Sequence, residues 1–186
     1  MRIVGGRFAG RNLTSPNDFR VRPTAEPVRA ALLDLLAPEL DGASLVDLFA
    51  GTGALGLEAI SRGARRCDFV ETRPSSLFAL KANVKRLGVE TRTRIFRKDA
   101  LPFAQQLGPD AYDLAFCDPP YESRMLDRVI EGWMRSHFAR TLAVEHARTH
   151  TLPPGALHRV FDDTAITIYR APLRAVAPEP ASGHTP

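Results

Sequence analysis

The segment 45–71, LVDLFAGTGALGLEAISRGARRCDFVE, constrains the fold more than any other part of the chain. It opens with a short apolar run that predicts a buried parallel strand. The run breaks into a turn at Gly51 and Gly53, where glycines allow a positive φ and a close backbone approach, and a helical pattern follows. A second apolar run ends in the acid Glu71. Strand, glycine turn, helix, strand and acid predict a nucleotide-binding βαβ unit in an α/β fold.

The glycine spacing alone fits more than one class of enzyme. A G-x-G-x-x-G pattern begins at Gly51, and Glu71 follows at the distance of a ribose-binding acid, as in nicotinamide-dependent oxidoreductases. Asp47, inside the first strand, argues for another ligand, because a carboxylate there suits a positive amino or sulfonium group better than a pyrophosphate. An oxidoreductase therefore stays an alternative, and a sulfonium cofactor is favoured.

A second motif follows the buried-strand pattern at 112–117, namely Asp118-Pro119-Pro120-Tyr121. An exocyclic amine of a base is a poor nucleophile, because its lone pair is delocalised into the ring. Hydrogen bonds from that amine to the Asp118 carboxylate and the Pro119 carbonyl hold it for attack, while Tyr121 offers a ring for stacking. The motif has no task in hydride transfer. It predicts an S-adenosylmethionine-dependent methyltransferase that acts on the amino group of a base.

The ends of the predicted strands carry the other candidates for the cofactor site, because ligands of such sheets bind beyond the carboxyl ends of the strands. Glu71 can accept hydrogen bonds from both ribose hydroxyls. Asp99 can accept from the adenine amino group, with a backbone N–H from Ala100, although Asp99 fits a helix N-cap equally well. The expected cofactor-binding residues are Asp47, Phe49, Gly51, Gly53, Glu71, Asp99 and Ala100.

Strand and helix patterns alternate along the chain and end in an antiparallel hairpin, which predicts a mostly parallel sheet with helices on both faces. Residues 1–23 are expected to form a basic hairpin extension, 24–170 the α/β domain, and 171–186 a disordered Pro/Ala-rich tail. The other expected elements are a helix capped by Thr24 and closed by Pro38, helices from Pro74 to Gly88, over Pro102–Leu107 and over Met125–Met134, and strands at Arg94–Arg97, Leu142–Glu145, Leu157–Asp162 and Ala165–Arg170.

Positive charge gathers at the start of the chain. The net charge is +4, and residues 1–29 hold six arginines against Asp18 and Glu26. Such a basic segment is typical of a protein that binds a polyanion, and a solvated surface is the alternative. The glycine-rich opening predicts a short bent hairpin with Arg7 and Arg11 on one side.

Composition excludes several other classes of protein. With 44% hydrophobic and 25% charged residues, the chain fits a soluble globular protein, and no apolar run is long enough for a bilayer. The opening lacks the apolar core of a signal peptide, so we expect a cytoplasmic protein. At 186 residues we expect it to be a monomer. Cys67 and Cys117 fall in strand patterns and are expected to be buried thiols. His146 and His150 lack a third ligand, so we expect solvated histidines and no metal.

These motifs together resemble the bacterial family that methylates guanine N2 in 16S ribosomal RNA of the small subunit. The resemblance runs from Arg2 to about Arg170. It rests on the opening RIVGGRFAGRNL, on Arg22-Pro23-Thr24 with Arg29, on DLFAGTGALGLEAISRGA with Glu71, and on DPPY. It implies a Rossmann-like class I methyltransferase fold, with a mostly parallel seven-stranded sheet, a small N-terminal hairpin extension and S-adenosylmethionine as cofactor.

The resemblance also implies roles for single residues. Asp118, Pro119 and Tyr121 would form the amine-binding loop, and the target would be N2 of guanine 966 in the assembling small subunit. The residues themselves suit guanine and adenine alike. A DNA adenine-N6 methyltransferase therefore stays an alternative, although it is less favoured because no separate target-recognition domain fits this length. A non-catalytic RNA-binding assembly factor stays an alternative as well. The expected RNA-binding residues are Arg7, Arg11, Arg22 and Arg29.

Overall fold

A computed structural model of the chain describes residues 1–16, 25–119 and 124–172. Within these ranges one seven-stranded sheet has the order β3-β2-β1-β4-β5-β7-β6. Its strands are β1 (Ser44–Asp47), β2 (Arg66–Val70), β3 (Thr93–Phe96), β4 (Tyr112–Cys117), β5 (Ala139–Ala147), β6 (Leu157–Phe161) and β7 (Thr164–Arg170). The first five strands in this order, β3, β2, β1, β4 and β5, pair in parallel with their neighbours, and β7 pairs antiparallel with both β5 and β6. The predicted mostly parallel α/β sheet is confirmed.

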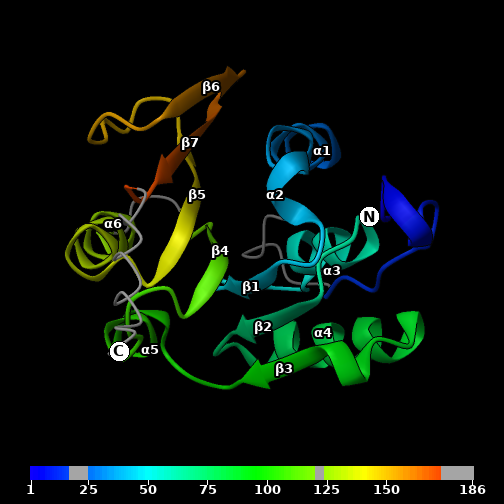
Figure 1. The fold of residues 1–186 in the computed structure, drawn as a ribbon. Helices are drawn as coiled ribbons and strands as arrows, with labels where there is room; N and C mark the ends of the chain where they lie inside the picture. Colours follow the sequence, from blue (N-terminus) through cyan, green and yellow to red (C-terminus); the bar gives the residue numbers. More distant parts are fainter. Residues whose placement is uncertain (17–24, 120–123, 173–186) are drawn as a thin grey trace, which may run out of the picture.

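Helices cover both faces of this sheet (Figure 1). Four α-helices pack with the N-terminal segment on one face, and the remaining two pack on the other. The helices are η1 (Gly6–Phe8), α1 (Glu26–Leu35), α2 (Ala37–Leu40), α3 (Ala54–Ser61), α4 (Pro74–Leu87), η2 (Glu90–Arg92), α5 (Ala100–Gln105) and α6 (Met125–Ser136).

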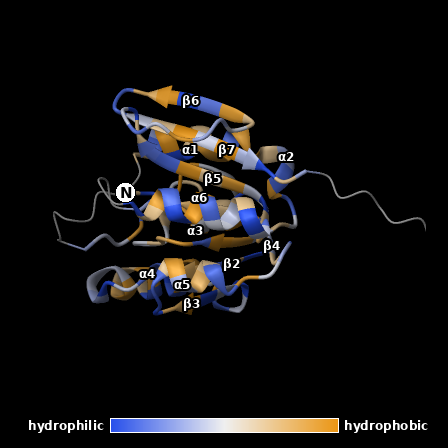
Figure 2. Cartoon of the chain, turned by 90° about the vertical axis from the view of Figure 1, so that its left-hand side faces the viewer, coloured by the Kyte–Doolittle hydropathy of each residue, from blue (hydrophilic) through white to orange (hydrophobic). Residues whose placement is uncertain are grey.

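The central strands β1, β2 and β4 are buried over most of their length, because both of their faces are covered. In β1, Leu45 contacts the cluster under α1–α4, whereas the next residue, Val46, contacts the cluster under α5 and α6. Figure 2 shows hydrophobic and hydrophilic residues following one another along α6. In α6 the buried residues recur at helical spacing toward the sheet; they are Leu126, Val129, Ile130 and Trp133.

The N-terminal extension is bound to α3. Its two ends meet at an antiparallel bridge between Arg2 and Asn12, and η1 forms the tip. Inside the tip the backbone N–H of Phe8 donates to Ser61 Oγ at 2.8 Å, and that hydroxyl donates to the Gly5 carbonyl at 2.6 Å. The expected bent hairpin is therefore reduced to one bridge around a 3-10 turn.

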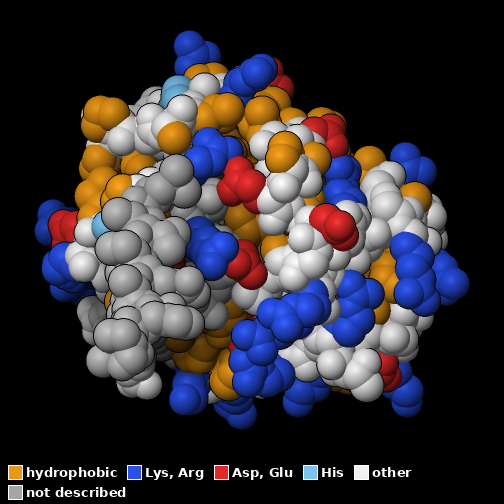
Figure 3. Space-filling model, viewed as in Figure 1, with side chains coloured by type: hydrophobic (Ala, Val, Ile, Leu, Met, Phe, Trp, Pro, Cys, Tyr) orange, Lys and Arg blue, Asp and Glu red, His pale blue; other side chains and the backbone are white. Residues whose placement is uncertain are grey.

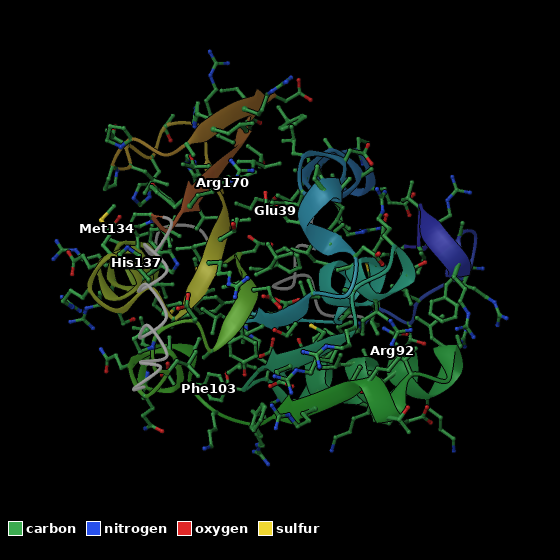
Figure 4. All side chains as sticks on the ribbon, viewed as in Figure 1. Glu39, Arg92, Phe103, Met134, His137 and Arg170 are labelled. Carbon is green, nitrogen blue, oxygen red and sulfur yellow. The ribbon has the colours of Figure 1, made fainter. Side chains whose placement is uncertain are left out.

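The region around Pro38 differs from the prediction. The first helix ends at Leu35, and Pro38 lies in the first turn of a separate short helix, α2, rather than closing α1. Proline is tolerated there because its missing N–H has no helical partner to bond. Glu39 then ties α2 to the sheet, since it accepts hydrogen bonds from Arg170 at 2.7 Å and from the Thr141 hydroxyl at 2.6 Å (Figure 4).

Cys67, Cys117, His146 and His150 lie on inner strands or next to them. Cys67 and Cys117 are buried free thiols, as predicted. The prediction for His146 is wrong, because its side chain points inward from β5, is only 3% exposed and shares a hydrogen bond with Thr167 Oγ1 at 2.9 Å. His150, at the end of β5, pairs with Asp127 at 2.9 Å. Across the described ranges no helix is long and apolar enough to cross a membrane.

Candidate active site

A cavity of about 500 Å³ opens at the carboxyl ends of the central strands. The strand order reverses at β1, between β2 and β4, and sheets of this kind bind ligands at that point. Most of the expected site residues come together here. Those that line the cavity are Asp47, Phe49, Gly51, Glu71, Asp99, Ala100, Asp118 and Pro119.

The turn after β1 gives the cavity its floor. Gly51 has a φ of 53°, and a Cβ added there would meet nothing within 4 Å, so the glycine leaves space on the ligand side. Gly53 does not line the cavity. Its φ is 79°, and an added Cβ would collide with Leu80 of α4, so Gly53 shapes the turn and lets α4 approach it.

Glu71 is held in place by backbone groups at the end of β2. Its Oε2 accepts from the N–H of Gly51 at 2.8 Å, and Oε1 accepts from the N–H groups of Thr72 and Arg73 at 2.7 and 2.8 Å. An ionised carboxylate has about four acceptor sites, so about one remains, on Oε2. The geometry fits one ribose hydroxyl directly, and a second requires a backbone hydrogen bond to give way.

Asp47 is the most deeply buried acid of the cavity, with 3% of its surface exposed. Its burial, together with the nearby carboxylates of Asp118 and Glu71, raises the pKa of Asp47 to about 7. A cation bound in the cavity would stabilise the ionised form of this carboxylate. This environment suits a positively charged ligand group and opposes a pyrophosphate.

Asp99 caps a helix and also lies at the cavity. Its Oδ1 accepts from the Leu101 N–H at 2.9 Å, which makes it the N-cap of α5. The same residue lines the cavity beside Ala100. The capping bond fixes the side chain and occupies one of its oxygens.

Two features of the cavity were not assigned from the sequence. Glu145, near the end of β5, lines it and is 6% exposed. Arg73 and Lys98 line it as well and bring positive charge, whereas the other charged lining residues in the described ranges are acids. The sequence signal for Glu145 is an acid at the end of a buried-strand pattern, the same signal that pointed to Glu71.

Comparison with known proteins gives the family. The family model described as "Conserved hypothetical protein 95" matches residues 1–160. Ribosomal RNA small subunit methyltransferase D of Escherichia coli (strain K12) is 35% identical over 72% of this chain and 69% of that protein. The chain belongs to this methyltransferase family.

Solved structures agree with this membership. The Escherichia coli protein yhhF matches with a TM-score of 0.79 and 31% identity, over 91% of this chain and 97% of that one. The hypothetical protein TTHA0928 of Thermus thermophilus matches with a TM-score of 0.78 and 31% identity, over 92% and 99%. The class I methyltransferase fold and the family implied by the sequence motifs are both confirmed.

Family membership does not make every motif arginine an RNA ligand. The prediction for Arg29 is wrong, because its side chain is 0% exposed. It donates to Glu58 Oε2 at 2.7 Å and to the Arg2 carbonyl at 2.6 Å, so it joins α1 to α3 and to the extension. A buried, hydrogen-bonded guanidinium supports the fold and does not reach a phosphate.

The remaining expected residues divide between the surface and the segments outside the described residues. Arg7 and Arg11 are exposed on the extension, and the Arg7 guanidinium lies 5.1 Å from the centre of the Phe8 ring. Arg22 and Tyr121 lie outside the described residues. Figure 3 shows further Lys and Arg side chains on the part of the surface where α4 and β3 lie.

Proposed function

We propose that the protein transfers the methyl group of S-adenosylmethionine to the exocyclic N2 of guanine 966 in 16S ribosomal RNA of the small subunit. The observation that carries the proposal is that one cavity holds two groups of residues, one for the cofactor and one for the target amine, which we call its two poles. Asp47, a buried acid suited to a cationic cofactor, lines the same cavity as the amine-binding pair Asp118 and Pro119.

At the first pole, the chain's own residues hold the cofactor. When bound, S-adenosylmethionine supplies a methyl group on a positively charged sulfur. Asp47 offers a carboxylate to the positive methionine end, and Glu71 accepts from the ribose. Gly51 leaves room for the ligand along the turn, while Asp99 and Ala100 face the adenine. The exposed space at Gly51 and the raised pKa of Asp47 both fit this ligand.

At the second pole, Asp118 and Pro119 hold the target amine. Hydrogen bonds from the two N2 hydrogens to the Asp118 carboxylate and the Pro119 carbonyl fix the amine and favour a tetrahedral nitrogen. Asp118 takes the proton that N2 loses when the new N–C bond forms and passes it to solvent. Tyr121 is proposed to stack on the base, as expected from the sequence.

The RNA substrate is supported by the names of the relatives and by the surface charge. The Escherichia coli relative is named a ribosomal RNA small subunit methyltransferase. The exposed Arg7 and Arg11 on the extension give the chain sites for backbone phosphates. We place the protein in the cytoplasm, as a monomer that acts on the assembling small subunit.

The test is the transfer of a labelled methyl group from S-adenosylmethionine to three substrates. These are small ribosomal subunits that lack the modification, naked 16S RNA and duplex DNA. The proposal expects label in the subunit RNA, mapped by nuclease digestion to N2-methylguanosine. Label in DNA alone, in N6-methyladenine, would replace the proposal with the adenine methyltransferase.

A further inference from the structure

Glu145 occupies the position next to Asp118 across the sheet. Strands β4 and β5 pair in parallel, with Cys117 opposite Val144, so the following residues, Asp118 and Glu145, continue the same register. Neighbouring strands are about 4.8 Å apart. Both acids also line the cavity. The two acids therefore lie side by side at the carboxyl ends of β4 and β5.

The two acids also project from the same face of the sheet. Side chains alternate between faces along a strand, so residues two apart share a face. Phe116 and Ala143, each two residues before one of these acids, both belong to the core cluster under α1–α4. Asp118 and Glu145 therefore lie on that face, where Asp47 also lies, two residues after Leu45 of the same cluster.

The chemistry of the base edge gives this pair a task. Guanine presents two neighbouring donors on its Watson–Crick edge, the N2 amino group and N1–H. Adenine presents one donor, its N6 amino group, beside an N1 that only accepts. One carboxylate beside another offers acceptors to both donors of the guanine edge, whereas an adenine N1 would place its lone pair against a carboxylate oxygen, acceptor against acceptor.

We propose that Glu145 determines the base specificity of the site: its carboxylate accepts the N1–H of the target guanine while Asp118 accepts from N2. The proposal rests on the proposed function and adds to it the selection of guanine over adenine. Amine binding by Asp118 and Pro119 suits both bases alike, so a neighbouring group must make the choice. Glu145 is a buried acid at the right place in the sheet to make it.

The test compares guanine with 2-aminopurine at the target nucleotide. The analogue keeps the 2-amino group but has an N1 without hydrogen. Small subunits are reconstituted with 16S RNA that carries either base, and kcat/KM for methyl transfer is measured for each. The wild-type protein should prefer guanine by about tenfold or more, the range of one good base contact.

The informative variant is Glu145→Gln, because its amide can accept from N1–H or donate to an unprotonated N1. It should reduce the ratio of guanine to 2-aminopurine severalfold, toward equality, mainly by raising the rate on the analogue. Glu131→Gln, an exposed carboxylate on α6, is the matched control and should leave the ratio at its wild-type value. Binding of S-adenosylhomocysteine by each variant verifies that it is folded.

Two outcomes would overturn the proposal. One is equal wild-type rates on the two bases, which needs no variant to be observed. The other is a Glu145→Gln variant that lowers both rates by the same factor, as a merely structural residue would. Failure of the proposed function gives a different result, in which the wild-type protein does not methylate guanine in 16S RNA at all.

Discussion

Two buried acids on the same side of the sheet have neighbours of opposite charge. Glu58 of α3 is fully buried and accepts from Arg29 Nε at 2.7 Å, from Arg62 Nη2 at 2.9 Å and from the Val4 N–H at 3.2 Å. Asp47 at the end of β1 is 3% exposed, and the charged groups that shift its pKa most are carboxylates. The first acid is compensated by arginines, whereas the second is poised for a cation.

The difference separates the structural part of the chain from the part that binds ligands. Glu58, through its partners, connects three segments that are distant in sequence, namely the extension, α1 and α3. The ionisation of Asp47 is opposed by burial and by neighbouring carboxylates. Changes at Glu58 should therefore cost stability, and changes at Asp47 should cost ligand affinity.

The largest expected effect is that of Glu58→Ala. Glu58→Ala removes the carboxylate that faces the buried Arg29 guanidinium, and breaking a buried ion pair in this way costs about 3–5 kcal/mol of unfolding free energy. Urea unfolding measures the loss. Glu90→Ala, at an exposed position of η2, is the control and should change little. A loss for Glu58→Ala below about 1 kcal/mol, within the range of exposed pairs, would remove the contrast with Asp47.

The next effect is that of Asp47→Asn on cofactor binding. Because a hydrogen bond to a charged group contributes about 1.5–3 kcal/mol, affinity for S-adenosylmethionine should fall about tenfold to a hundredfold. The unfolding free energy at pH 8 should stay the same or rise, since a buried charge is removed. Calorimetry measures the affinity for S-adenosylmethionine, and urea unfolding measures the unfolding free energy. Asp41→Asn, an exposed change, should alter neither.

A smaller effect is the pH dependence of stability without ligand. The pKa of Asp47 is about 7 in the folded state, against an ordinary value of 3.8. The folded state therefore keeps a proton on Asp47 at pH values where the unfolded state has lost it, and this difference in proton binding adds to the unfolding free energy. The contribution is complete below pH 3.8 and is lost as the pH rises through 7. Unfolding of the wild-type protein and of Asp47→Asn at several pH values isolates it. Identical profiles would contradict the raised pKa.

The smallest effect on the protein itself is that of the double change Arg7→Ala and Arg11→Ala. Both side chains are exposed, so stability should be unchanged, in contrast to any change at Arg29. If each contacts one phosphate, the slope of log affinity against log salt for 16S RNA should flatten by about 1–2 units. Arg135→Ala with Arg159→Ala, on α6 and β6, is the matched control. An unchanged slope would mean that these arginines form a solvated surface and do not bind RNA phosphates.

Local patterns were readable from the sequence, and pairings between distant segments were not. The strand at 112–117 matches β4, and the strand–turn–helix–strand unit around Gly51 lies where it was predicted. These elements depend on neighbours within a few residues. Arg29 was misread because its partner, Glu58, lies on another helix, and nothing near Arg29 in the sequence reveals the pair.

The candidate site follows the same rule. Asp47, Glu71 and Asp118 were found because each follows or ends a recognisable strand. Glu145 has the same local signal, but its role depends on the register between β4 and β5. The strand pattern did not show that His146, the next residue, would be buried beside Thr167 of β7, since that depends on β7 pairing with β5 in the same sheet.

The number of protons released when S-adenosylmethionine binds tests the role of Asp47 most directly. It is measured by calorimetry at pH 7 in two buffers of different ionisation enthalpy. A carboxylate with a pKa of about 7 is half protonated there, so cofactor binding should release about half a proton from the wild-type protein and almost none from Asp47→Asn. Equal proton release by the two proteins, or none by either, would contradict the claim that Asp47 receives the cofactor's positive charge.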